Sequence, residues 1–297
     1  MNIKWDKKKF TTYLIWTFSV AWILQVIASV FARQGNQTVF QMLLSVVMFA
    51  PMLGAVMAKL PLRGMGWKPK LKGNVRFLLA AWLMPAFFAI LGAVLYFVIF
   101  PSRLDFSGDY MVATAGEVFL EQMEAQGITM QMYFVIVFVQ AFTYAPWLNM
   151  FFALGEEAGW RGAMQPMLND RFGKPKGRMI GGIIWGAWHW PVMILAGYEY
   201  GLEYWGAPFV GMALFCLVTV VMGTLLDFVY EKTNCIWIPA LGHGAFNCFA
   251  TVPLMFLNTD YLDQLILGPS PIGVISVLPE LVVAVLVLVK DKKCSGK

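Results

Sequence analysis

The chain has 297 residues, of which 59% are hydrophobic and only 13% are charged, and its net charge is +5. An average soluble domain carries about 25% charged residues, so a soluble fold of this length could not bury so much apolar surface. The composition excludes an ordinary soluble enzyme. Because the basic residues lie in short loops, they indicate orientation in a membrane rather than nucleic-acid binding.

A helix that spans a bilayer needs about 20 mostly apolar residues. Eight segments meet this requirement, in chain order at about 11–31, 38–58, 77–100, 131–155, 179–197, 207–229, 236–257 and 270–289. The one long connection, 101–130, is acidic, and a short amphipathic helix is predicted at about 114–126. No stretch has the composition of a soluble domain. We therefore predict an all-α, polytopic membrane protein with one transmembrane domain over residues 1–297.

The distribution of positive charge supports this order of helices. With the N-terminus in the cytoplasm, 20 of the 22 Lys and Arg fall in cytoplasmic segments, and only Arg33 and Arg103 fall outside. The outer loops carry acids instead, with Glu199 and Glu203 among them. Because Lys and Arg are enriched in cytoplasmic loops, we expect eight helices with both termini inside. The short chain favours the cell membrane of a bacterium or archaeon.

Ionisable side chains inside a bilayer are costly, and they indicate function by default. Three predicted helices carry such groups at similar depth, in the cytoplasmic half of the bilayer. The residues concerned are Glu156, Glu157, Arg161, His189, His243 and Asn247. Asp227 is expected to reach water at the end of its helix, and Glu280, within the eighth segment, receives no role.

The spacing of these residues predicts which of them share a helix face. Glu157 and Arg161 are four residues apart and can form an ion pair along one face. Glu156 then points about 100° away, toward a cavity between helices. His243 and Asn247 are also four residues apart, and the glycines on either side of His243 leave room for a close backbone or a substrate.

This set of side chains suits the hydrolysis of a peptide bond. A carboxylate and a histidine can remove a proton from water, and a second histidine with an amide can stabilise an oxyanion. Other designs of membrane protease lack their parts, because the chain has no H-E-x-x-H motif and no second intramembrane Asp to pair with Asp227.

The motifs occur in a fixed order: Glu156-Glu157-x-x-x-Arg161, then Trp185-x-x-x-His189, then His243-x-x-x-Asn247. In them the sequence resembles the CAAX protease and bacteriocin-processing family of intramembrane proteases, also called the Abi or type II CAAX prenyl endopeptidase family. The second motif has Trp where Phe is commoner. The resemblance covers about 156–247 and implies a catalytic core in the helices of 131–257.

The resemblance also implies a substrate and a division of labour. The substrate is a membrane-associated peptide or protein, of the prenylated CAAX type or a leader or pheromone peptide. The implied roles are Glu156 and His189 as the pair that activates water, His243 and Asn247 as the oxyanion site, and Glu157 and Arg161 as residues that hold the site in shape.

The residues leave the question of a metal open. A Glu, two His and an Asn can also bind zinc. Since Asn is a weak zinc ligand, we expect a site without a cofactor. In the alternative, a divalent metal such as zinc is bound by Glu156, His189 and His243.

Two other functions remain as alternatives. One is a non-catalytic membrane scaffold or immunity protein of the same fold, although a scaffold need not keep costly intramembrane acids. The other is a proton-coupled transporter, with Glu156 and the histidines as a relay. Against a transporter, the two halves of the chain show no matching short or interrupted helices.

Overall fold

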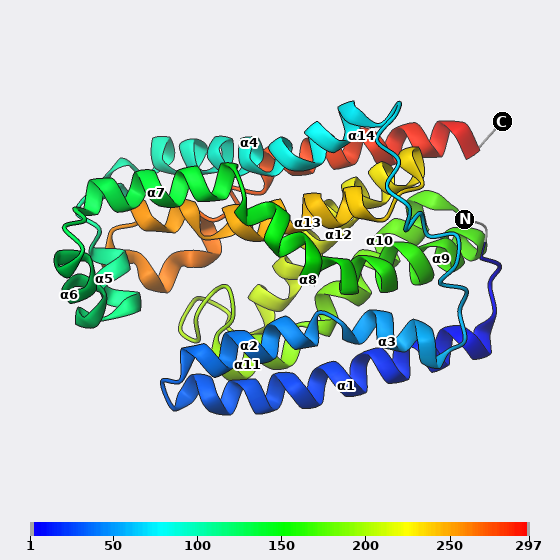
Figure 1. The fold of residues 1–297 in the computed structure, drawn as a ribbon, viewed down its shortest axis with the longest axis horizontal. Helices are drawn as coiled ribbons and strands as arrows, with labels where there is room; N and C mark the ends of the chain where they lie inside the picture. The colour runs from blue at the N-terminus through cyan, green and yellow to red at the C-terminus, as the bar shows by residue number, and fades with distance from the viewer. Residues whose placement is uncertain (1–2, 296–297) are drawn as a thin grey trace.

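The computed structural model of the protein describes residues 3–295, which form helices and connecting loops without a β-strand. The predicted all-α fold is confirmed. The α-helices are α1 (Lys7–Arg33), α2 (Gln37–Val47), α3 (Ala50–Met57), α4 (Val75–Ile99), α5 (Asp109–Ala115), α6 (Glu117–Ala125), α7 (Met130–Phe142), α8 (Ala145–Gly159), α9 (Gln165–Phe172), α10 (Lys174–Trp188), α11 (Trp190–Ala196), α12 (Phe209–Thr233), α13 (Trp237–Ala250) and α14 (Leu278–Ser295). Figure 1 shows an elongated bundle in which the start of α1 and the end of α14 lie at the same end.

Several of these helices are long and apolar enough to cross a membrane. Within residues 3–295 there are five such segments, or six if α6 and α7, bent by 92° to each other, are taken as one span. The five are Lys7–Arg33, Gln37–Met57, Val75–Ile99, Lys174–Ala196 and Phe209–Thr233. The predicted amphipathic helix at 114–126 corresponds to α6, with α5 before it. The predicted count of eight spans is not confirmed.

The three predicted segments that are not among these five are interrupted or shifted in the structure. The segment 131–155 is divided between α7 and α8 at Thr143, whose φ of −107° and ψ of −92° are not helical. The segment 236–257 contains α13, which has 14 residues and is followed by a 3-10 turn. The segment 270–289 becomes helical only at Leu278, and its first apolar residues, such as Ile272, are buried inside the protein instead. Apolar composition alone does not distinguish a buried loop from a span.

Prolines mark the interruptions that shape the site. Pro51, Pro146 and Pro191 each stand in the first turn of a helix, where their missing N–H costs nothing. The last of them starts α11 directly after α10, and His189 is the residue between the two helices. His189 therefore lies at a break between two helices, within the candidate span Lys174–Ala196.

A buried side chain from α1 satisfies the backbone at this break. Gln25 donates from Nε2 to the carbonyl of Trp188 at 2.9 Å, and its Oε1 accepts from the N–H of Val192 at 3.3 Å. Non-helical backbone at membrane depth requires partners of this kind, because lipid supplies none. Gln25 thus fixes the position of the segment that carries His189.

Glycines allow the helices that carry the site to approach closely. A Cβ on Gly244 of α13 would lie 2.7 Å from the backbone nitrogen of Met150 on α8. A Cβ on Gly182 of α10 would lie 2.3 Å from the Cα of Val220 on α12. The expected room for a close backbone beside His243 is therefore occupied by α8, the helix that carries the glutamates.

A buried ionic cluster ties α10 to α12 and α14. Arg178 donates to Asp227 at 2.7 Å and to Glu231 at 3.0 Å, and it also pairs with Asp291 of α14. Asp227 was expected to reach water, but it is only 4% exposed. That expectation was wrong, because Arg178 of α10 binds Asp227 inside the protein. The spacing of residues along α12 does not reveal a contact with another helix.

Candidate active site

The four predicted catalytic residues line one cavity of about 320 Å³. Glu156 comes from α8, His189 from the break between α10 and α11, and His243 and Asn247 from α13. Side chains of α1, α2, α11, α12 and several loop residues complete the wall. Three segments that are far apart in the sequence thus deliver their polar groups to the same space.

The carboxylate of Glu156 is oriented by two indole groups. Its Oε2 accepts from Nε1 of Trp185 at 2.7 Å and from Nε1 of Trp160 at 3.0 Å, and the residue is 2% exposed. Its Oε1 accepts no hydrogen bond from the described residues. Trp160 begins a π-helical turn that extends to Met164, and such turns occur frequently at functional sites. Glu156 therefore has one anchored oxygen and one free oxygen.

Trp185 has more roles than the sequence assigned to it. It was singled out only as the aromatic residue four positions before His189. In the structure its N–H binds Glu156, its carbonyl accepts from His189, and its ring lies 4.3 Å from the guanidinium carbon of Arg161. Its ring also packs edge-on against His243, with 5.2 Å between centroids, so one indole contacts groups of the first and third motifs, which the helical spacing could not reveal.

Glu157 connects two of the motifs directly. Its Oε1 accepts from Arg161 at 3.1 Å, so the predicted ion pair is confirmed, and it also lies 2.8 Å from Nδ1 of His243. All three side chains are buried. The contact with His243 was missed, since spacing rules relate residues of one helix and this pair joins α8 to α13. Because a carboxylate accepts, Nδ1 of His243 donates, and Nε2 remains available.

His189 presents one ring nitrogen to the cavity. Its Nδ1 lies 3.0 Å from the carbonyl of Trp185, so Nδ1 carries the hydrogen and Nε2 is left for a ligand. Its ring stacks on Tyr198, with 6.2 Å between centroids and 7° between planes, and packs edge-on against Phe215 at 4.9 Å. Glu156 and His189 share the cavity without a direct hydrogen bond between them.

Asn247 has a partner that sequence reasoning missed. Its Nδ2 donates to Oδ1 of Asn149 at 3.1 Å, and both residues line the cavity. Asn149 stands seven residues before Glu156 in α8, which places it two turns away on the same face. This spacing was a usable signal, and it would have added Asn149 to the predicted site.

Glu199 also lines the cavity, although the sequence indicated an acid of an outer loop. The connection between α11 and α12 folds back into the bundle, where Tyr200 donates to the carbonyl of Ile272 at 2.9 Å. Glu199 has a φ of +75°. Residues other than glycine rarely adopt this conformation, and those that do cluster at functional sites. Burial raises the pKa of Glu199 to about 7.

The raised pKa of Glu199 predicts a loss of stability as the pH rises. In the unfolded chain this carboxyl has a pKa near 4.5. Between the two values the folded protein holds a proton that the unfolded chain has released, so stability is greatest below pH 4.5 and falls up to about pH 7. The expected loss is at most about 3.5 kcal/mol, at about 1.4 kcal/mol per pKa unit.

Thermal unfolding of the detergent-solubilised protein at pH 5 and pH 8 measures this effect. The Glu199→Gln variant should lose less Tm between the two pH values than the wild type does. Glu203→Gln, an exposed position of the same loop, is the matched control and should behave as the wild type. An equal loss of Tm in Glu199→Gln and the wild type would contradict the prediction.

The residues proposed for the alternative metal site do not fit one as they lie. Residues 3–295 contain no group of three or more His, Cys, Asp or Glu side chains arranged to bind a metal ion. In the set Glu156, His189 and His243, one glutamate oxygen and Nε2 of each histidine are free of hydrogen bonds to the described residues, but the three side chains do not form such a group. We therefore derive no step through a metal.

Comparison with known proteins supports the resemblance seen in the motifs. The family model described as "Type II CAAX prenyl endopeptidase Rce1-like" matches residues 138–249. This stretch runs from α7 to α13 and includes every residue of the three motifs. No curated protein matches the chain. The resemblance to the CAAX protease family is therefore confirmed, and over residues 138–249 the protein is similar to the type II CAAX prenyl endopeptidases, a family of membrane proteases.

Proposed function

We propose that the protein is an intramembrane endopeptidase that hydrolyses a peptide bond in a membrane-associated peptide. The observation that carries this proposal is the convergence of Glu156, His189, His243 and Asn247 on one cavity among the helices. Polar groups at such depth are costly. A scaffold would not need four of them around one space.

Glu156 is the proposed general base. Its free Oε1 takes a proton from a water molecule that Nε2 of His189 orients, and the water oxygen bonds to the carbonyl carbon of the substrate. The two indoles that hold Oε2 support this role, because they keep the carboxylate in one orientation. When the C–N bond breaks, the proton on Glu156 passes to the departing amine.

His243 and Asn247 are the proposed oxyanion site. Asn247 donates one amide hydrogen to Asn149, which leaves the second hydrogen for the substrate oxygen. His243 in its protonated form donates Nδ1–H to Glu157 and Nε2–H to the same oxygen. Two donors aimed at the developing charge stabilise the tetrahedral intermediate. Glu157 and Arg161 act through His243, as positioning residues.

We further propose the orientation of the protein in the membrane. α7–α8, α13 and α14 complete a set of eight spans, and both termini lie in the cytoplasm of a bacterial or archaeal cell. The clustering of Lys and Arg in the segments at the end of the bundle where α1 begins and α14 ends supports this orientation (Figure 1). The active site then opens to the cytoplasmic side, and its substrate is a prenylated CAAX-type end or a leader or pheromone peptide.

Cleavage in isotopically labelled water tests the proposed reaction. The purified protein in liposomes is given lipidated and unlipidated membrane-associated peptides in water enriched in ¹⁸O. We expect products whose new carboxyl group carries one ¹⁸O atom, because the attacking oxygen comes from water. Absence of labelled products with every peptide, combined with solute uptake by the same liposomes, would favour the transporter. Absence of both would favour the scaffold.

A further inference from the structure

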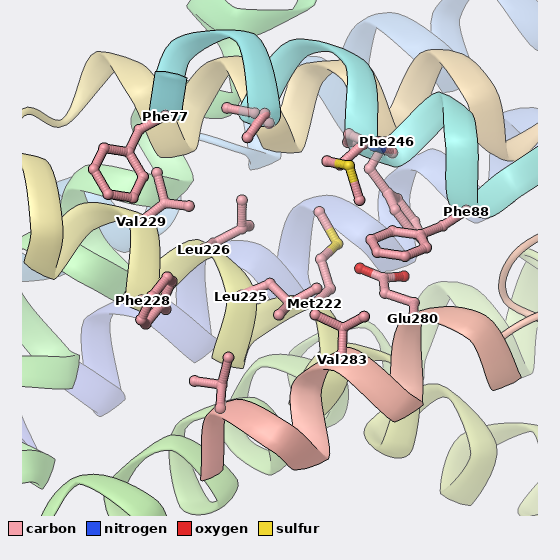
Figure 2. A pocket seen from close by; sticks show the side chains of 16 residues that line it. Phe77, Phe88, Met222, Leu225, Leu226, Phe228, Val229, Phe246, Glu280 and Val283 are labelled. Carbon is pink, nitrogen blue, oxygen red and sulfur yellow. The ribbon is translucent and has the colours of Figure 1, made fainter. Parts of the chain in front are cut away.

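A second cavity, of about 230 Å³, lies between α4, α12, α13 and α14 (Figure 2). Every side chain that lines it is apolar except that of Glu280 on α14. The apolar wall includes Phe88 from α4 and Leu226 from α12. Cavities of this composition accept hydrocarbon, and a single polar group fixes the orientation of the ligand.

Glu280 is an unexplained polar group in this apolar wall. It is only 5% exposed, and its Oε2 is buried without a hydrogen-bond partner among the described residues. Figure 2 shows its carboxyl pointing from α14 into the space beside Phe88 and Met222. A buried polar group without a partner destabilises a protein by about 1–3 kcal/mol, and by more when it is charged. A ligand that donates a hydrogen bond to Oε2 of Glu280 would remove this cost.

We propose that this cavity binds a single-chain membrane lipid that ends in a hydroxyl group, with the hydroxyl donating to Glu280. A hydroxyl is favoured over an ammonium group because an ammonium has three donors, and the lining offers only this one acceptor side chain. The volume is below the roughly 300–1,000 Å³ of sites for drug-sized ligands, which favours one hydrocarbon chain over a two-chain phospholipid. The membrane is the source, since Met84, which lines the cavity from α4, is 38% exposed.

The second cavity adjoins the catalytic one. Met222 and Phe246 line both cavities, so their side chains form part of the partition between them. Gly242, which also lines the second cavity, directly precedes His243 in α13. A hydrocarbon chain bound in the second cavity therefore packs against the residues that separate it from the catalytic cavity. The binding itself does not depend on the proposed protease activity and is tested without a peptide substrate.

Photolabelling in liposomes tests the site. The probes are a long-chain primary alcohol and the hydrocarbon of equal length, each with a diazirine in its chain, and labelled residues are mapped by mass spectrometry. We expect the alcohol to label the cavity walls about fivefold more than the hydrocarbon does, as one hydrogen bond would give. Glu280→Leu should abolish this preference, and Glu280→Gln should retain it because its amide oxygen also accepts.

A pair of neighbouring substitutions tests the location. Val283→Trp fills the cavity and should abolish its labelling, whereas Val282→Trp, at the exposed position beside it, should not. Equal labelling by the two probes in the wild type would overturn the proposal. So would equal labelling of Val283→Trp and Val282→Trp. If Val283→Trp does not fold, the comparison of the two probes on the wild type and Glu280→Leu decides alone.

Discussion

Glu156→Gln is expected to lower kcat for peptide cleavage by about 10²–10⁴-fold, the range for removal of a general base. Glutamine keeps the size of the side chain, and its amide oxygen can still accept from the indoles of Trp160 and Trp185. It cannot take a proton from water. The expected loss therefore falls on kcat, while the fold and the binding of substrate are retained.

The measurement is cleavage of a labelled peptide by purified variants in liposomes, with thermal unfolding as the check on folding. Glu203→Gln removes an acid from the exposed part of the α11–α12 loop and serves as the matched control, with kcat near that of the wild type. A folded Glu156→Gln variant whose kcat stays within about tenfold of the wild type would exclude Glu156 as the base.

Glu157→Leu is expected to destabilise the protein by about 3–5 kcal/mol, the cost of removing one partner from a buried ion pair. Arg161 is 3% exposed and donates to Glu157, so its charge would be left without that carboxylate. His243 would lose the acceptor of its Nδ1–H at the same time. The fraction of the variant that folds should also have a reduced kcat, since His243 is no longer held in place.

Denaturation in mixed micelles measures the change in the free energy of unfolding. The double variant Glu157→Leu with Arg161→Met is the informative control, because removal of both charges leaves no unpaired ion. We expect it to be more stable than Glu157→Leu alone. A loss below about 1 kcal/mol in the single variant, or a double variant less stable than the single one, would contradict the role assigned to the pair.

The helices that the sequence predicted best are those with long, uninterrupted apolar runs. The segments 11–31, 77–100 and 207–229 correspond to α1, α4 and α12, each slightly longer than predicted. Their boundaries follow from hydropathy, because lipid tolerates only backbone that is hydrogen-bonded within its own segment. The segment 270–289 was less well predicted, since its first residues lie in a loop that is buried by protein. By composition, an apolar residue in a buried loop cannot be distinguished from one in a span.

The helix break at His189 shows which features the local sequence can explain and which it cannot. Pro191 stands in the first turn of the helix that starts after the break, a position that suits proline. The sequence did not indicate what stabilises the break. Gln25, which supplies both of the hydrogen bonds described above, lies more than 160 residues earlier in the chain.

By itself, the sequence predicted that the protein is helical and apolar enough for a membrane, which residues are candidates for the chemistry, and that Glu157 pairs with Arg161. These features depend on composition and on spacing within one helix. Only the tertiary structure decided that Glu157 also holds His243, that the indole of Trp185 holds Glu156, and that Glu199 lines the same cavity as Glu156. Each of these contacts joins elements distant in the chain, and their approach depends on small residues and helix breaks whose partners no local pattern specifies.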